Sequence, residues 1–90
     1  MAWTIEFDRA AERELRKLGR VEAQRILRFL NDRVAPLPDV RSLGEALKGS
    51  TLGGLWKYRV GDYRIIALIE DAILRVLVVR VGHRREIYKR

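Results

Sequence analysis

The first residues of the chain alternate between apolar and polar side chains. Trp3, Ile5 and Phe7 are separated from one another by single polar residues, and this period of two is typical of a strand with one buried face. Asp8 follows where a helix can begin, because its carboxylate can accept hydrogen bonds from the free amides of a first helical turn. The pattern predicts a short N-terminal strand that leads directly into a helix.

Helical spacing replaces this alternation after Asp8. Ala11, Leu15 and Leu18 recur at intervals that place them on one face of a first helix, which ends at Gly19. A second helix is expected from about Arg20 to Val34, with its apolar face formed by Ala23, Ile26, Leu27, Leu30 and Val34. Two prolines follow it closely, and residues before proline avoid helical geometry. We therefore expect a hairpin of two helices.

The last third of the chain has the composition of β-strands. Three runs, Leu55–Val60, Tyr63–Glu70 and Ile73–Val81, are rich in apolar and β-branched residues. The two-residue link Gly61-Asp62 is typical of a type II′ hairpin, and Asp71-Ala72 forms a second short link. These runs predict a three-stranded antiparallel meander.

Residues 39–54 hold four of the seven glycines, and we expect a loop there. Within it, Ser42 and Glu45 have the capping-box spacing that can start a short helical turn. Together the elements predict an α+β fold, in which the N-terminal strand and the meander form one twisted sheet with the helices on one face. The length of 90 residues predicts a single domain over residues 1–90.

The predicted hairpin turn fixes which side chains share a face. With Gly61-Asp62 as the two-residue loop, Arg59 lies opposite Arg64, and Lys57 shares their face because side chains alternate along a strand. Like charges placed directly opposite each other destabilise a sheet. This arrangement therefore indicates an anion-binding face. A second basic cluster, with His83 and Arg84, follows the last predicted strand and is expected to approach the same face.

The charge balance of the whole chain agrees with an anionic partner. The net charge is +7, and residues 55–90 contribute +5 of it, from nine basic and four acidic residues. A pI near 10.6 is typical of proteins that bind a polyanion such as nucleic acid. The chain has no cysteine and no apolar run of membrane-spanning length. We expect a cytoplasmic protein with no membrane partner.

The residues of the sequence also argue against several classes of enzyme. No group of carboxylates is expected to converge as a two-metal nuclease requires, so no metal site is predicted. No glycine-rich phosphate loop precedes a helix, and neither serine lies in a nucleophile-elbow pattern, so no cofactor is predicted either.

Metal-free RNA cleavage fits the residues that remain. The 2′-hydroxyl of RNA can attack its own adjacent phosphate, so the protein need only orient the strand, stabilise charge and exchange two protons. Arginine and lysine supply charge stabilisation, and a histidine or tyrosine near the phosphate can exchange protons.

The chain resembles the RelE/ParE superfamily of toxins from type II toxin–antitoxin systems, and within it the RelE-like branch. The order of elements and three segments carry the resemblance: Leu47–Gly49, Trp56–Ile65 and Val81–Tyr88. The resemblance implies a RelE-like fold and a ribosome-dependent mRNA endoribonuclease that needs no metal and inhibits translation. It also implies a RelB-like antitoxin as partner, and operator DNA binding only through the complex with that antitoxin.

The resemblance also implies roles for individual residues. By position, the catalytic set is Lys57, Arg64, Arg84 and Tyr88, and we add His83 as a candidate general base because the chain has Leu55 where studied members carry a second lysine. The expected RNA-binding residues are Arg59, Arg85 and Lys89.

Two other functions are compatible with the sequence. One is a ParE-like toxin that poisons DNA gyrase by protein contact, without nuclease activity. The other is an RNA-binding module without enzymatic activity, which predicts salt-dependent binding and no cleavage.

Overall fold

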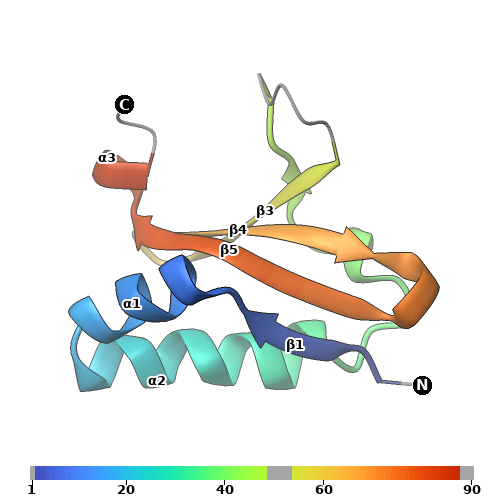
Figure 1. The fold of residues 1–90 in the computed structure, drawn as a ribbon, viewed down its shortest axis with the longest axis horizontal. Coiled ribbons are helices and arrows are strands. Elements are labelled where there is room, and N and C mark those ends of the chain that lie inside the picture. The colour runs from blue at the N-terminus through green and yellow to red at the C-terminus, as the bar shows by residue number, and fades with distance from the viewer. Residues whose placement is uncertain (1, 49–53, 88–90) are drawn as a thin grey trace.

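The computed structural model describes residues 2–48 and 54–87, which form a five-stranded sheet with helices against it (Figure 1). The strand order is β1-β5-β4-β3-β2; β1 is parallel to β5, and all other neighbours are antiparallel. The strands are β1 (Thr4–Phe7), β2 (Glu45–Ala46), β3 (Leu55–Val60), β4 (Tyr63–Glu70) and β5 (Arg75–His83). The predicted α+β class, with its N-terminal strand and antiparallel meander, is confirmed.

The predicted helix hairpin covers one face of the sheet (Figure 1). It consists of α1 (Arg9–Lys17) and α2 (Arg20–Phe29), and a π-helical turn, Leu30–Val34, extends the second helix. A short helix α3 (Arg84–Ile87) lies on the opposite face of the sheet and is not predicted by the sequence pattern. Among the described residues, no helix is long and apolar enough to cross a membrane.

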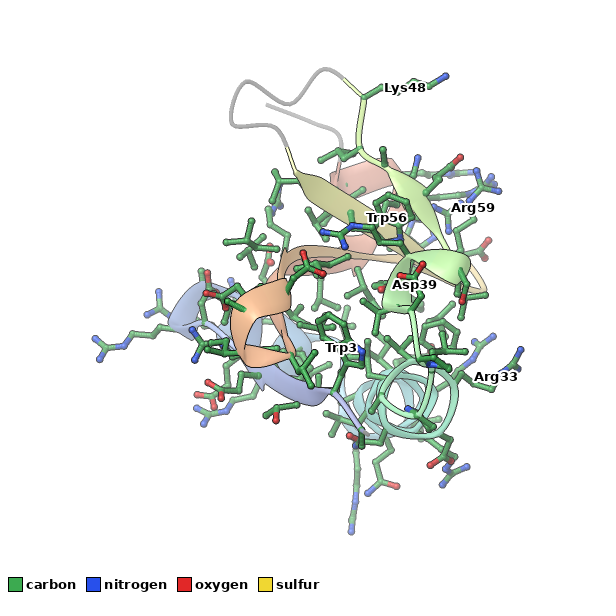
Figure 2. All side chains as sticks on the ribbon, turned by 90° about the vertical axis from the view of Figure 1, so that its right-hand side faces the viewer. Trp3, Arg33, Asp39, Lys48, Trp56 and Arg59 are labelled. Atoms are coloured by element: carbon green, nitrogen blue, oxygen red, sulfur yellow. The ribbon has the colours of Figure 1, made fainter. Side chains whose placement is uncertain are left out.

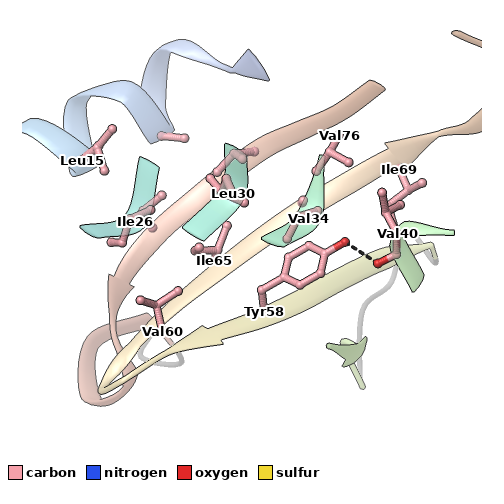
Figure 3. Packing of buried hydrophobic residues seen from close by; sticks show 14 of the residues in the cluster. Leu15, Ile26, Leu30, Val34, Val40, Tyr58, Val60, Ile65, Ile69 and Val76 are labelled. Atoms are coloured by element: carbon pink, nitrogen blue, oxygen red, sulfur yellow. Dashed lines mark hydrogen bonds between the residues drawn. The ribbon is translucent and has the colours of Figure 1, made fainter. Parts of the chain in front are cut away.

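The main core lies between the helix hairpin and the sheet (Figures 2 and 3). Figure 2 shows Trp3 inside the fold, whereas Arg33 and Arg59 point outward on the same side. The hairpin contributes Ile26, Leu30 and Val34, as its apolar spacing predicts. The facing side chains from the sheet are those that share the inner side of each strand, among them Tyr58, Val60, Ile65, Ala67, Ile69, Val76, Val78 and Val81.

The pairing of β4 with β5 contains one irregularity. Ala67 pairs with Val78, whereas the neighbouring Ile66 pairs with Arg80, so Val79 is one residue too many for regular pairing. Such a β-bulge shifts all later residues by one position, and a shift of one position turns each side chain to the other face of the sheet. The bulge therefore decides which face of the sheet each side chain at the end of β5 points to.

Glu14 of α1 completes the hydrogen bonding of β5 beyond the end of β1. β1 ends at Phe7, which pairs with Val78, so the following residues of β5 have no strand beside them on that edge. One carboxylate oxygen of Glu14 accepts a 2.9 Å hydrogen bond from the amide of Val81, and the other accepts a 3.1 Å hydrogen bond from Arg80. A helix side chain thus replaces the missing strand.

Residues 39–48 differ from the predicted loop. Val40–Ser42 form a 3-10 turn, and Glu45 lies in β2 instead of a helical turn. The residue that caps the turn is Asp39, whose carboxylate accepts a hydrogen bond from the amide of Arg41. Ser42 instead donates its hydroxyl hydrogen to the Asp39 carbonyl oxygen. The capping-box interpretation of Ser42 and Glu45 is therefore wrong, because pairing with β3 holds Glu45 extended.

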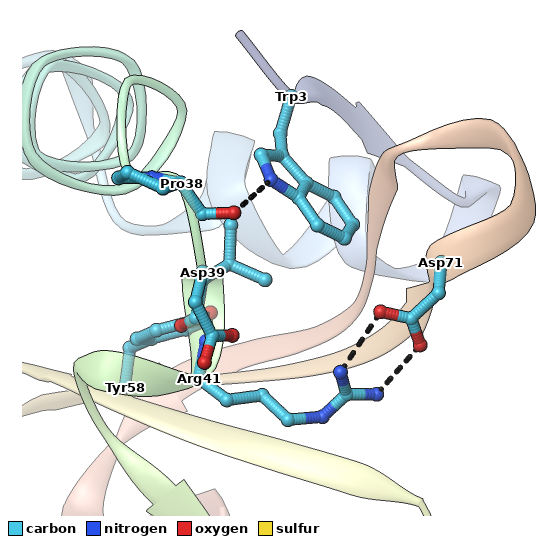
Figure 4. Close-up of polar contacts among 7 residues, drawn as sticks. Trp3, Pro38, Asp39, Arg41, Tyr58 and Asp71 are labelled. Atoms are coloured by element: carbon cyan, nitrogen blue, oxygen red, sulfur yellow. Dashed lines mark hydrogen bonds and ion pairs between the residues drawn. The ribbon is translucent and has the colours of Figure 1, made fainter. Parts of the chain in front are cut away.

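Side chains of β3 and of the turn that begins at Asp71 hold this segment in place (Figure 4). The buried Tyr58 hydroxyl donates a 2.8 Å hydrogen bond to the Val40 carbonyl oxygen. Arg41 forms two hydrogen bonds, of 2.9 and 3.0 Å, with the carboxylate of Asp71. The ring nitrogen of Trp56 donates to the Leu43 carbonyl oxygen at 2.7 Å. These contacts fix the path of the chain into β2.

The last strand is displaced from its predicted bounds. The prediction is Ile73–Val81, whereas β5 is Arg75–His83. Asp71–Ile73 form a 3-10 turn, and Leu74 has a φ of 51°, in the left-handed region, so extended pairing begins only after it.

Candidate functional site

The β3–β4 hairpin places three cationic residues on the side of the sheet away from the helix hairpin. Its register is the predicted one, with Arg59 opposite Arg64 and Lys57 opposite Ile66. The intervening residues Tyr58 and Val60 point into the main core. Strand alternation therefore directs Lys57, Arg59 and Arg64 to the other face.

Arg64 is the buried member of this group. Its relative exposure is 8%, and it is the one buried charged residue in the described part of the chain. One terminal nitrogen of its guanidinium donates 3.0 Å hydrogen bonds to the carbonyl oxygens of Gly61 and Tyr63. The guanidinium is thus held beneath the β3–β4 turn, which fixes its position before any ligand arrives.

Lys57 and Arg59 share one acidic partner, Glu45 of β2. The carboxylate oxygen Oε1 of Glu45 lies 3.1 Å from the ammonium of Lys57 and 3.5 Å from the guanidinium of Arg59. The side chain of Lys57 is only 16% exposed, whereas that of Arg59 is 65% exposed. The hydrogen bond from Lys57 and the positive charge of Lys57 and Arg59 hold the pKa of the Glu45 carboxyl below its usual value.

A cavity of about 360 Å³ opens at this edge of the sheet. It lies between α2, β2 and β3, and its lining residues are Phe29, Leu43, Gly44, Glu45, Lys57 and Arg59. The cavity therefore combines an aromatic wall with two cations and one carboxylate.

Arg84 lies beside the turn that buries Arg64. Its backbone amide donates a 2.7 Å hydrogen bond to the Asp62 carbonyl oxygen, and its guanidinium is 3.7 Å from the Asp62 carboxylate. Gly82, two residues earlier, pairs with Arg64. The structure therefore brings Arg84 close to Arg64, as expected. Arg85 follows as an exposed residue of α3.

His83 is placed on the other side of the sheet from Arg64. It pairs with Tyr63, and their rings meet edge to face with centroids 5.7 Å apart. Tyr63 packs against the main core, so the expected approach of His83 to the face of Lys57 is not observed. The bulge at Val79 is the cause, because regular pairing would have put His83 on the face of Arg64. The ring nitrogen Nδ1 of His83 accepts a 3.1 Å hydrogen bond from the amide of Arg85.

Two expected site residues, Tyr88 and Lys89, lie outside the described residues. Glu45 is the residue of this site that the sequence reasoning missed. It stands twelve positions before Lys57, in a segment expected to be a loop, and only the pairing of β2 with β3 brings the two together. Within residues 2–48 and 54–87, no group of three or more histidine, aspartate or glutamate residues is arranged to hold a metal ion.

Comparisons with known proteins agree with this fold. Residues 5–88 match the family described as the ParE toxin of type II toxin–antitoxin system, parDE. The chain is 31% identical to Toxin RelG of Mycobacterium tuberculosis over 90 residues, which is 100% of both chains.

Solved structures of toxin–antitoxin complexes are also similar. The complex RelBE2 from Mycobacterium tuberculosis contains a chain with a TM-score of 0.82 and 28% identity, and the match covers 96% of this chain and 95% of that one. The intact RelBE complex of E. coli contains one with a TM-score of 0.70 and 25% identity, over 91% and 96% of the two chains.

These similarities and the basic β3–β4 hairpin define a toxin of a type II toxin–antitoxin system. The chain belongs to the RelE/ParE superfamily of such toxins, and the resemblance read from its sequence is confirmed.

Proposed function

We propose that this toxin is an endoribonuclease that cleaves mRNA on the ribosome and thereby inhibits translation. The observation that carries the proposal is the cluster of four cationic side chains around the β3–β4 hairpin: Lys57, Arg59, Arg64 and Arg84. Lys57, Arg59 and Arg64 are carried by paired strands, and the backbone of Arg84 is hydrogen-bonded to their turn. Donors positioned in this way can stabilise charge that develops on a phosphate.

The proposed reaction needs no metal ion. The 2′-oxygen of the substrate forms a bond to the adjacent phosphorus while the bond from phosphorus to the 5′-oxygen breaks. The products are a 2′,3′-cyclic phosphate and a 5′-hydroxyl end. One proton leaves the 2′-hydroxyl and one is delivered to the departing 5′-oxygen. We assign charge stabilisation to Lys57, Arg64 and Arg84, and strand binding to Arg59, Arg85 and Lys89.

Proton exchange requires a residue other than arginine. Tyr88 and His83 are the two residues of the proposed set with a suitable group. The rings of His83 and Tyr63 meet edge to face, on the other side of the sheet from Arg64. We therefore favour Tyr88 for proton exchange, and the substitutions Tyr88→Phe and His83→Asn separate the two roles.

The toxin is also proposed to bind a RelB-like antitoxin. The similar structures of RelBE2 and RelBE contain toxin and antitoxin together. The net charge of +7 fits an antitoxin whose toxin-binding segment is acidic. Contact with operator DNA would occur only through that complex, and the site of action would be the cytoplasm.

Primer extension on a defined mRNA, with and without programmed ribosomes, tests the nuclease proposal. New 5′ ends at codon-phased positions are expected only when ribosomes are present. Intact mRNA in both reactions, together with growth arrest in cells, would contradict it.

The alternative target is DNA gyrase, and one observation favours it: the matching family is described as the ParE toxin. In that case toxicity would come from protein contact, and Arg64→Ala with Arg84→Ala would stay toxic. Supercoiling by purified gyrase, measured with added toxin, distinguishes this function from the nuclease. Salt-dependent RNA binding without either effect would instead indicate a non-enzymatic RNA-binding module.

A further inference from the structure

Glu45 makes a contact that the proposed nuclease chemistry does not require. A single oxygen of its carboxylate lies 3.1 Å from the ammonium of Lys57 and 3.5 Å from the guanidinium of Arg59. These are the two cations of β3 that are proposed to meet an RNA phosphate. The same contacts favour the ionised carboxylate. In the free protein, therefore, an internal anion already occupies the position between them.

The backbone around Glu45 is held against β3 over several residues. Glu45 pairs directly with Lys57, and Ala46 pairs with Trp56. The Trp56 ring nitrogen donates a 2.7 Å hydrogen bond to the Leu43 carbonyl oxygen. Gly44 approaches β3 so closely that a Cβ there would overlap the carbonyl oxygen of Lys57. Strand pairing therefore fixes the backbone of Glu45 beside the two cations, and its side chain needs to span only a short distance to reach them.

A carboxylate and a phosphodiester offer the same features to this pair of cations. Each carries one negative charge and two oxygens that accept hydrogen bonds. The cavity of about 360 Å³ beside Glu45 gives room for a ligand to reach Lys57 and Arg59 from solvent. Glu45 itself is 53% exposed in its side chain, and exposed ion pairs are weak, so an incoming phosphate can displace it.

We propose that Glu45 occupies the phosphate position at Lys57 and Arg59 in the free toxin, so that RNA binds only by displacing it. Glu45 thereby weakens the binding of free single-stranded RNA and raises the dependence of the toxin on additional contacts, such as those available on a ribosome. This inference rests on the proposed function, because it takes the Lys57–Arg59 pair as a site for mRNA phosphate.

The test compares Glu45→Gln with a control of equal net charge. Glu12→Gln removes one carboxylate from an exposed ion pair on α1, where Glu12 is 56% exposed and lies 3.2 Å from Arg16. Both variants raise the net charge by one, so the effect of net charge alone on RNA binding is the same in both. The probe is a 2′-O-methylated single-stranded RNA oligonucleotide, which cannot be cleaved by attack of a 2′-hydroxyl, and binding is measured by fluorescence anisotropy over a salt series.

Glu45→Gln is expected to bind the oligonucleotide about three- to tenfold more tightly than the wild-type protein, as the loss of competing exposed ion pairs implies. Glu12→Gln is expected to change the affinity less than about twofold. Glu45→Ala, which removes the carboxylate entirely, is expected to behave as Glu45→Gln does. The dependence on salt should stay close to that of the wild-type protein, because the same phosphates are neutralised on binding whether or not Glu45 is displaced first.

Equal affinities of the Glu45→Gln and Glu12→Gln variants would overturn the inference. So would a Glu45→Gln variant that loses mRNA cleavage on ribosomes while its RNA affinity stays at the wild-type value, since the carboxylate would then act in the reaction itself. Because the probe cannot be cleaved, the binding comparison is independent of nuclease activity. A wild-type protein that leaves ribosome-bound mRNA intact contradicts the proposed function, and the affinity ratio of the two variants still decides the role of Glu45.

Discussion

Arg59 and Arg64 lie directly opposite each other across β3 and β4, yet their guanidinium groups have different surroundings. Arg64 is 8% exposed and donates to two carbonyl oxygens of the β3–β4 turn. Arg59 is largely exposed and lies 3.5 Å from Glu45. Different partners thus relieve the repulsion expected between opposed like charges, and one of the two arginines is fixed in place by the turn.

Because Arg64 is buried under the turn and Arg84 is exposed, we expect substitutions of the two to affect mRNA cleavage alike but the stability of the fold differently. Each of Arg64→Ala and Arg84→Ala is expected to lower the rate of mRNA cleavage by about 10²–10³, because each removes a charge donor for the transition state. Arg64→Ala is also expected to lower the free energy of unfolding by about 1–2 kcal/mol, since two carbonyl groups lose their donor. Arg84→Ala, at an exposed position, should unfold like the wild-type protein.

Single-turnover cleavage on programmed ribosomes and urea unfolding measure the two effects separately. Arg13→Ala serves as the control, because Arg13 is exposed on α1 and its loss changes the net charge by the same amount. Cleavage by the Arg84→Ala variant at the rate of the Arg13→Ala variant would show that Arg84 has no part in the reaction.

Gly44 gives a second prediction, about the segment that carries Glu45. Its φ is +80°, and a Cβ would overlap the Lys57 carbonyl oxygen and lie 2.8 Å from the ring nitrogen of Trp56. Gly44→Ala is expected to cost about 1–2 kcal/mol for the left-handed backbone, and about 1–3 kcal/mol more for the overlap. The midpoint of urea unfolding measures the sum.

Gly19→Ala is the matched control for the backbone component. Gly19 has a φ of +88°, but nothing lies within 4 Å of the position of its Cβ. Only the cost of a positive φ is therefore expected, and Gly44→Ala should be clearly the more destabilising of the two. Equal losses would mean that the close approach of Gly44 to β3 contributes nothing to stability.

The sequence predicts the parts of this fold that depend on local periodicity. The two-residue turn Gly61-Asp62 sets the register of β3 with β4, so the relation of Arg59 to Arg64 follows from counting residues. The apolar spacing of α2 and of the π-helical turn that extends it likewise predicts that Ile26 and Leu30 are buried. Both features arise within a few neighbouring residues of the chain.

Features that depend on distant pairing are not predictable in this way. The bulge at Val79 is a single extra residue, and it turns His83 to the side of Tyr63 instead of Arg64. β2 has only two residues, too few for a periodic pattern, and its position depends on contacts with β3. The acidic residue of the site, Glu45, is therefore found only in the structure.

Glu14 provides a third prediction, because it joins α1 to the free edge of β5. Glu14→Ala is expected to lower the free energy of unfolding by about 1–3 kcal/mol, since the Val81 amide loses a charged acceptor at 2.9 Å and Arg80 loses its partner at 3.1 Å. Glu12→Ala breaks only an exposed pair on the same helix, and about 0.5 kcal/mol or less is expected. Thermal and urea unfolding of both variants give the comparison, and similar losses would speak against a role for Glu14 in closing the strand edge.

Tyr58 gives a prediction for alkaline solution. Burial raises the pKa of its hydroxyl to about 12, from an ordinary value of 10.0. The folded protein therefore keeps this hydroxyl protonated at pH values where the unfolded chain ionises it. The corresponding stabilisation is complete below pH 10 and is lost as the pH rises from about 10 to about 12, by an amount on the order of 2–3 kcal/mol.

Tyr58→Phe should remove this component of the pH dependence. At neutral pH the variant is expected to be about 1–2 kcal/mol less stable, because the buried Val40 carbonyl oxygen loses the 2.8 Å hydrogen bond from Tyr58. Between pH 10 and 12 its free energy of unfolding should fall less steeply than that of the wild-type protein, so the two curves approach each other. Parallel curves for the wild-type and Tyr58→Phe proteins would mean that the hydroxyl of Tyr58 ionises as readily in the folded state as in the unfolded chain.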